Sequence, residues 1–263
     1  MGSAGKNWKF QAWGLAVLFW CLCASQVAAA DLDVPPDDAG IPASAAAARW
    51  YVKLGAARIF DQSSSNLYSQ TLATVGPIPL GVGPQTFLVG RGAIYSDAWT
   101  AILEAGYFFA PNWSLEVATG VPVWIKVRIT GFSPAGAASG TVLTEVLPAA
   151  IPITAVYHFR PFGGLQPYLG IGLEPIFQLS LKDRFSTGGS YDPTVGVIFQ
   201  GGFDYMFGEH WGVFFDVKKI FAQSKGKATG IDLGPPVGVV PVSSTIKTSG
   251  QPWLATAGFT YRF

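Results

Sequence analysis

Few side chains in this sequence have the types and spacing that chemistry requires. The chain contains two histidines, His158 and His210, and two cysteines, Cys21 and Cys23. A serine hydrolase would need a histidine as base beside the serine, and a carboxylate to orient that histidine. Neither histidine belongs to a cluster with metal-ligand spacing. We therefore expect no metal or other cofactor, and any catalytic use of a histidine depends on the element that carries it.

The charged residues follow a more regular pattern than the histidines. In residues 115–129, Glu116, Lys126 and Arg128 occupy one face of an alternating stretch, and aliphatic side chains occupy the other. A period of two indicates a β-strand whose two faces meet different surroundings. The aliphatic face consists of Leu115, Val117, Val121, Val123, Ile125, Val127 and Ile129. Since this face is almost entirely aliphatic, we expect it to contact lipid and the charges to point inward.

The composition also favours a membrane environment. The mean hydropathy is +0.34, and only 13% of the residues are charged. No run of about 18 apolar residues follows residue 30, so membrane-spanning helices are not expected. The 32 glycines, 19 prolines and 14% aromatic residues instead suit many strands that are joined by turns and loops.

Residues 1–30 have the pattern of a secretory signal peptide. Lys6 and Lys9 form the basic region, residues 13–23 the apolar core and residues 27–30 a small-residue cleavage site. The alternative, a transmembrane anchor, would need a longer apolar core. Both cysteines lie in this segment, so we expect no disulfide or thiol chemistry in the mature chain. Residues 31–48 are rich in Asp, Pro and Ala, which predicts a flexible periplasmic segment.

Eight alternating stretches follow and predict eight strands in residues 49–263. Three short connections and four long ones join them in strict alternation, an asymmetry typical of outer-membrane barrels. The long connections cover residues 61–97, 131–145, 182–192 and 222–250. The predicted strands are residues 49–60, 98–109, 115–129, 146–159, 165–181, 194–207, 211–221 and 251–263.

The last strand decides between a membrane barrel and a soluble β-sandwich. It alternates strictly and ends on Phe259, Tyr261 and Phe263, all on one face. In a soluble edge strand these aromatic side chains would face water without cover. In an outer-membrane barrel the same face meets lipid, and the terminal pattern resembles the signal by which such barrels are recognised and inserted. We therefore predict an all-β protein, an eight-stranded antiparallel transmembrane β-barrel of the bacterial outer membrane, with these three residues as its assembly signal.

The inward faces of the predicted strands carry both charged and apolar side chains. Eight strands leave a lumen just wide enough for side chains, which disfavours a wide aqueous pore. A structural network of ion pairs is one interpretation of the charges, and a selective channel is the other. The expected lumen charges are Lys53, Glu104, Glu116, Lys126, Arg128, Glu174, Asp204, Asp216, Lys218 and Arg262. The expected apolar lining is Ile102, Phe108, Trp124, Val156, Ile176, Ile198, Met206, Phe214 and Leu254.

With the strands in place, the chain resembles the outer membrane protein W (OmpW) family over nearly all of its mature length. The resemblance rests on the order of several short stretches rather than on any one of them. The stretches are 50–55 (WYVKLG), 110–116 (APNWSLE), 147–148 (LP), 157–159 (YHF), 167–172 (PYLGIG), 200–205 (QGGFDY), 252–253 (PW) and 261–263 (YRF). The resemblance implies an eight-stranded barrel with a narrow, largely apolar interior and passive entry of small hydrophobic molecules.

The sequence departs from the family pattern at three places. The histidine common after Pro122 is absent, Gln251 replaces the aspartate usual before Pro-Trp, and residues 194–196 lack a common tryptophan. The last change falls at a possible constriction, so gate residues are not transferred from the family.

Three classes of function are compatible with such a barrel. The first is a conduit for small hydrophobic molecules, which the family implies can leave sideways into lipid. The second is a structural or adhesive barrel, or surface receptor, without transport. The third, a lipid-modifying enzyme, is disfavoured because the predicted topology puts both histidines at the periplasmic end.

The expected partners follow from the same interpretation. They are outer-membrane lipid and lipopolysaccharide, the barrel-assembly machinery during insertion, and small hydrophobic solutes. Without Lys6 and Lys9, the 17 basic residues fall to 15 against 16 acidic ones, so nothing indicates nucleic-acid binding.

Overall fold

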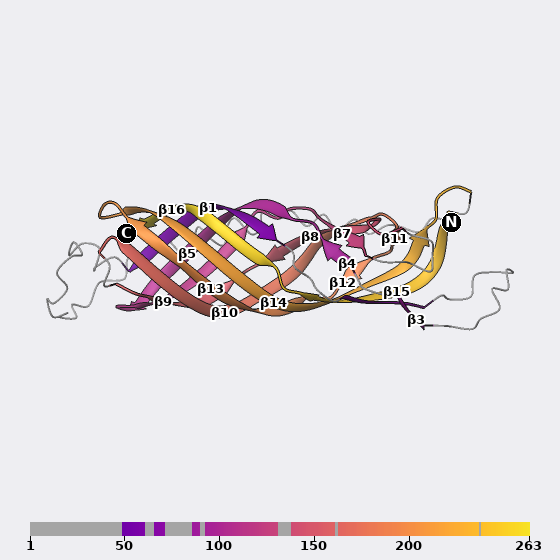
Figure 1. Cartoon of the computed structure of the whole chain (residues 1–263), viewed down its shortest axis with the longest axis horizontal. Coiled ribbons are helices and arrows are strands. Elements are labelled where there is room, and N and C mark those ends of the chain that lie inside the picture. Colours follow the sequence, from indigo (N-terminus) through magenta and orange to yellow (C-terminus); the bar gives the residue numbers. More distant parts are fainter. Residues whose placement is uncertain are drawn as a thin grey trace, which may run out of the picture. The chain divides into compact units, whose positions relative to one another are not determined.

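The computed structural model describes residues 49–60, 66–71, 86–89, 93–130, 138–160, 163–236 and 238–263. The predicted signal peptide and residues 31–48 lie outside these ranges. Eight strands form a closed antiparallel ring in the order β1-β5-β6-β9-β10-β13-β14-β16, and β16 pairs back with β1. Figure 1 shows these tilted strands side by side. They are β1 (Trp50–Phe60), β5 (Ala98–Ala110), β6 (Trp113–Gly120), β9 (Ile153–His158), β10 (Leu165–Asp183), β13 (Thr194–Met206), β14 (Trp211–Asp232) and β16 (Trp253–Arg262).

The ring confirms the predicted eight-stranded barrel, and its two faces differ as the alternation requires. Along β10, the outward side chains of Leu169, Ile171 and Leu173 are more than half exposed, while Tyr168 beside them is buried. Such an exposed apolar band is the lipid face of a membrane barrel. Among the described residues, no helix is long and apolar enough to cross a membrane.

Aromatic side chains gather at the end of the ring where the short connections lie, called the turn end below. Trp211 and Tyr261 lie 4.9 Å apart between ring centroids, and Tyr261 and Phe263 lie 5.1 Å apart. Trp113 and Tyr157 make a similar pair at 5.1 Å. Such a belt is expected where a barrel meets the membrane interface.

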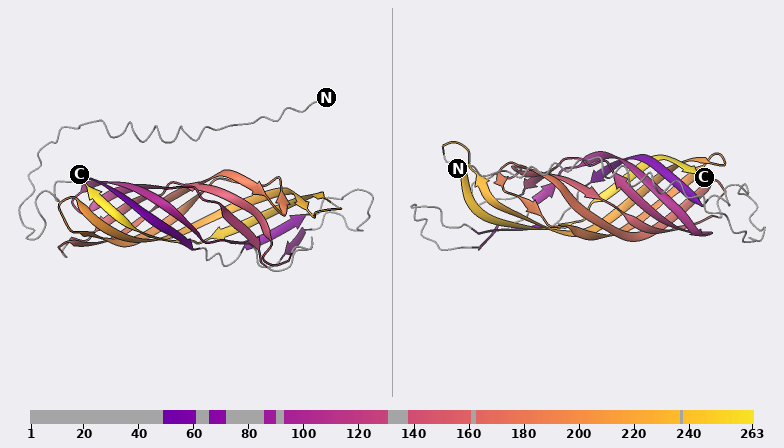
Figure 2. Two further views of the ribbon diagram at one scale, coloured as in Figure 1. Left: turned by 90° about the horizontal axis from the view of Figure 1, so that it is seen from above. Right: turned by 180° about the vertical axis from the view of Figure 1, so that it is seen from behind.

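Several strands lie outside the eight-strand ring. The end opposite the turn end is called the loop end below. At the loop end, β14 and β15 continue together beyond the ring (Figures 1 and 2). β2 pairs with β15, β3 with β2, β4 with β7, and both β11 and β12 with β14. The additional strands are β2 (Asn66–Thr71), β3 (Thr86–Val89), β4 (Ala93–Tyr95), β7 (Ile125–Ile129), β8 (Val142–Ala150), β11 (Ser186–Thr187), β12 (Ser190–Tyr191) and β15 (Val239–Gly250).

All four predicted loops are partly β-sheet, since β8 begins at Val142 in the second loop and β11 and β12 lie in the third. The fourth predicted loop, residues 222–250, forms a hairpin in which β14 extends through Asp232 and pairs with β15. The first predicted loop contains β2, β3 and β4. These segments show no aliphatic alternation in the sequence, because many of their residues are Ser, Thr, Lys and Gly. Cross-strand hydrogen bonding, rather than an apolar face, defines these strands.

The predicted third and fourth strands are each interrupted. The third divides into β6 and β7 around residues 121–124, and the fourth into β8 and β9 around residues 151–152. The β6–β9 ladder ends at Val117 and Ile153, and the β7–β8 ladder starts at Ile125 and Val146. Pro122, Pro148 and Pro152 lie between these ladders. Since proline lacks a backbone N–H, it cannot donate to a ladder.

The interruption reverses the alternation, so the predicted face assignment is wrong in β7. Glu116 and Ala118 point inward in β6, but Val127 and Ile129 are the buried side chains of β7. They pack with Leu143 and Val146 of β8. The four residues after Gly120 are irregular, and the strand resumes with its other face inward.

Three predicted lumen residues fall on the wrong side because of this reversal. Lys126 is exposed. Arg128 is half-buried, and its Nη1 donates a hydrogen bond to the carbonyl of Gly140 at 3.1 Å. Trp124 is 36% exposed, and the Lys182 Nζ lies 3.9 Å from its ring centroid. None of the three belongs to the buried charge network described next.

Candidate functional site

A network of buried ion pairs fills the ring near its turn end. The Lys53 ammonium lies 3.4 Å from Glu116 Oε2 and 3.3 Å from Asp204 Oδ1. Arg262 Nη2 lies 3.0 Å from Asp204 Oδ2. All four side chains are at most 3% exposed. Charges this far from water require close partners, and here each carboxylate binds at least one cation.

Lys218 forms the second centre of the network. Its Nζ lies 2.6 Å from both Glu104 Oε1 and Asp216 Oδ1, and 4.0 Å from Glu116 Oε1. Glu116 thereby joins the two lysines, since it also accepts from Lys53. Four carboxylates and three cations are thus connected across β1, β5, β6, β13, β14 and β16.

Neutral side chains complete the filling of the lumen. The Tyr51 hydroxyl donates to Glu116 Oε2 at 3.0 Å, and the Gln200 amide donates to Glu116 Oε1 at 2.8 Å. The Tyr168 ring lies 4.2 Å from the Lys53 ammonium. Gly106 leaves room for Tyr51, because a Cβ at Gly106 would overlap the tyrosine ring. Together these contacts fill the turn-end half of the lumen with side chains.

Ser114 and His158 form a hydrogen-bonded pair that resembles part of a catalytic triad. The Ser114 Oγ lies 2.9 Å from His158 Nε2, and both residues are fully buried. Within the described residues, His158 Nδ1 has no hydrogen-bond partner, so the carboxylate of a triad is missing. The Phe108 ring packs 4.8 Å from the imidazole. The pair is therefore part of the lumen packing rather than an accessible nucleophile.

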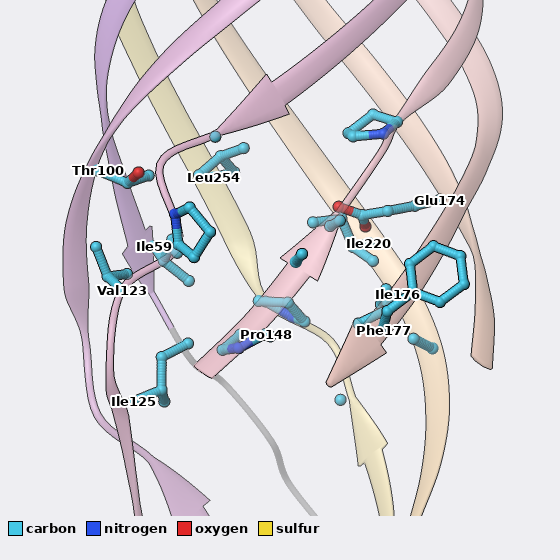
Figure 3. Close-up of a pocket in the computed structure, with 18 of the residues that line it drawn as sticks. Ile59, Thr100, Val123, Ile125, Pro148, Glu174, Ile176, Phe177, Ile220 and Leu254 are labelled. Carbon is cyan, nitrogen blue, oxygen red and sulfur yellow. The ribbon is translucent and has the colours of Figure 1, made fainter. Parts of the chain in front are cut away.

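A cavity of about 260 Å³ lies on the loop-end side of the network. Its walls are mainly apolar, and Figure 3 shows Ile59, Ile176, Ile220 and Leu254 around it. Glu104, Glu174 and Lys218 also line it, so the cavity meets the edge of the ion network. A mostly apolar cavity with a few polar groups is the usual form of a small-molecule site.

The cavity wall includes the interruption between the two ladders. Val121, Pro122 and Val123 line it from one side, and Pro148, Ala149, Ala150 and Pro152 from the other. One backbone hydrogen bond, from Ala118 N to the Pro152 carbonyl at 3.0 Å, marks the turn-end limit of this region. These wall residues were not predicted from the sequence, although the three prolines inside two predicted strands were a signal.

The predicted lumen residues divide into two groups. Ile102, Ile176 and Leu254 line the cavity with Glu104, Glu174 and Lys218. The other predicted apolar residues of the ring strands do not line the cavity. They are Phe108, Val156, Ile198 and Phe214, which are buried, and Met206, which is half-buried.

Tyr191 of β12 lines the loop end of the cavity, beyond the ring. Burial raises the pKa of its phenol well above the ordinary value, and the nearby Tyr95 adds to the shift. The phenol is therefore neutral at physiological pH. Its backbone N–H donates to the Gln178 side-chain oxygen at 2.7 Å, which ties β12 to β10.

Comparison with known proteins places this geometry in a family. A sequence model of the OmpW family matches residues 85–263. The chain belongs to the OmpW family. It is 37% identical to the uncharacterized outer-membrane protein y4mB of Sinorhizobium fredii over 66% of this chain and 70% of that protein. It is 26% identical to the outer membrane protein AlkL of Ectopseudomonas oleovorans over 66% of this chain and 73% of AlkL.

Solved structures support the same fold. The crystal structure of the outer membrane protein OprG from Pseudomonas aeruginosa is similar with a TM-score of 0.62 and 19% identity. The match covers 82% of this chain and 96% of OprG. The solid-state NMR structure of AlkL in lipid bilayers has a TM-score of 0.55 and 20% identity. The match covers 89% of this chain and 97% of AlkL. This OmpW-family chain is therefore an outer-membrane barrel in a lipid environment, as its sequence predicts.

Proposed function

We propose that this OmpW-family barrel gives small hydrophobic molecules passive passage into the outer membrane. The observation that carries the proposal is the apolar cavity, whose wall includes a region of the ring without a strand ladder. The family resemblance implies passive entry of small hydrophobic molecules, which agrees with this role. Passage of this kind needs no energy source and no turnover.

The route is set by what fills the two halves of the lumen. A solute that enters from the loop end reaches the cavity and then meets the buried ion pairs around Lys218 and Lys53. An apolar molecule gains nothing from displacing these charges, and separating them would be costly. The straight path is therefore closed.

The sideways path crosses the wall between Val121–Val123 and Pro148–Pro152. No ladder pairs join these two described segments, whereas the other neighbouring strands of the ring are joined along their facing lengths. Opening this wall breaks few backbone hydrogen bonds, because proline has no backbone N–H group to donate one. An apolar solute would then exchange an apolar cavity for lipid at little cost.

The second candidate function is a structural or adhesive barrel without transport. The hairpin of β14 and β15, with β2 beside it, extends beyond the ring and offers a surface to a partner. This interpretation assigns no function to the cavity, which is why the conduit is preferred.

Uptake of a hydrophobic fluorescent tracer by cells with and without the protein separates the two functions. A variant that fills the cavity, Ala150→Trp, should lower protein-dependent uptake several-fold. Ala150 lines the cavity and belongs to the segment Pro148–Pro152, which no ladder joins to Val121–Val123. Leu169→Trp is the matched control, since Leu169 is 60% exposed on the lipid face. If the inserted wild-type barrel leaves uptake unchanged, the conduit fails and the structural or adhesive interpretation replaces it.

A further inference from the structure

Among the described residues, Glu174 is a buried acidic side chain at the cavity that forms no ion pair. It projects from β10 and is only 5% exposed. Its Oε2 has no hydrogen-bond partner within the described part of the chain. Figure 3 shows the carboxylate pointing from β10 into the cavity beside Ile220.

The nearby cations form ion pairs with other carboxylates. Lys218 lines the same cavity, but its close contacts are with Glu104 and Asp216, each at 2.6 Å. Lys53 lies between Glu116 and Asp204. The charge of Lys218 still acts on Glu174 without forming an ion pair, and the apolar Ile176 and Ile220 line the cavity with it.

A buried carboxyl group without a partner is costly, and the cavity offers the space for a partner to bind. Burial of a polar group without a compensating hydrogen bond is unfavourable in proteins. A pure hydrocarbon in the cavity would leave the Glu174 carboxyl group buried without this hydrogen bond. A molecule with a hydroxyl group at one end would donate a hydrogen bond to the carboxylate and place its apolar body against the remaining walls.

An alcohol fits this site better than an ammonium ion does. A cation would lose its hydration on entering an apolar cavity, and a single carboxylate compensates only part of that loss. A hydroxyl group loses less and can act as both donor and acceptor, so it can bond Glu174 in either protonation state.

We propose that Glu174 is a specificity-determining residue that selects hydrophobic alcohols over hydrocarbons of the same length. This inference rests on the proposed conduit and adds the substrate class to it. Sites that hydrogen-bond a polar group of the substrate discriminate against analogues without it, because the polar group of the site is then unpaired.

The test compares uptake of radiolabelled 1-decanol and decane by cells with an intact outer membrane. Protein-dependent uptake should favour decanol in the wild type. Glu174→Leu should lower the decanol-to-decane ratio about tenfold, as expected for the loss of one buried hydrogen bond. Glu174→Gln should keep most of the preference, because its amide oxygen still accepts a hydrogen bond. Leu173→Val, at the neighbouring position of β10 and more than half exposed on the lipid face, is the control and should leave the ratio near the wild-type value.

The outcomes separate the two proposals. If neither tracer enters through the wild-type barrel, the conduit itself fails. If both enter but the wild type shows no preference for decanol, or Glu174→Leu leaves the ratio unchanged, the role of Glu174 is overturned while the conduit stands. Should Glu174→Leu fail to insert, Glu174→Met takes its place with the same expected loss of preference, and an unchanged ratio in that variant overturns the role equally.

Discussion

Replacement of Lys53 by methionine tests whether the ion network holds the barrel together. Lys53 is fully buried between Glu116 at 3.4 Å and Asp204 at 3.3 Å. Methionine keeps most of the length of the side chain but removes the charge, so two buried carboxylates lose a cation that they share. Loss of one partner of a buried ion pair typically costs about 3–5 kcal/mol. The network already has four carboxylates and three cations, so no spare cation within it replaces Lys53.

Lys126→Met is the matched control. Lys126 belongs to the same set of predicted lumen charges, but the structure places it on an exposed face. Its replacement should change the free energy of unfolding by less than about 0.5 kcal/mol. The measurement is reversible denaturant unfolding of the barrel in lipid vesicles, followed by tryptophan fluorescence and by heat-modifiable gel mobility.

A second substitution separates charge from packing. Glu116→Gln, added to Lys53→Met, removes a carboxylate that lost its cation, while Lys218 keeps Glu104 and Asp216, and Arg262 keeps Asp204. It should restore part of the lost stability. Equal losses for Lys53→Met and Lys126→Met would refute the network as a stabilising element. A double variant that is no more stable than Lys53→Met would show that lost packing, rather than unpaired charge, causes the effect.

Two further predictions concern the β7 face and assembly. With cysteine introduced singly as Lys126→Cys or Val127→Cys, an impermeant thiol reagent applied to folded barrels should label the first variant and not the second, because Lys126 is exposed and Val127 is buried. The opposite labelling pattern would restore the unbroken alternation of residues 115–129. Changing Tyr261 and Phe263 together to Ser should sharply reduce outer-membrane assembly, because Phe263 is 61% exposed in the aromatic belt at the turn end. Unchanged heat-modifiable migration from outer-membrane fractions would contradict an assembly signal at these residues.

The alternation of residue types was sufficient to predict the ring. β1, β10, β13 and β16 begin or end within a few residues of their predicted limits, since a lipid-facing strand needs an apolar side chain at every second position. Alternation also placed Lys53, Glu104 and Asp216 inside. It did not indicate which charges pair, because the partners are far apart in the sequence. Lys53 and Glu116 are 63 positions apart, and Glu104 and Lys218 are 114.

The sequence by itself determined the fold class, because strand periodicity and the terminal aromatic pattern are local properties of the pleated chain. The tertiary structure decided the reversal of faces after Gly120, since periodicity cannot show how irregular residues around Pro122 reset a strand. It also decided the cavity, which exists only where the two proline-interrupted segments lie opposite each other. Glu174 shows the same distinction: alternation points it inward, but only the close partners of Lys218 leave its carboxylate facing an apolar space.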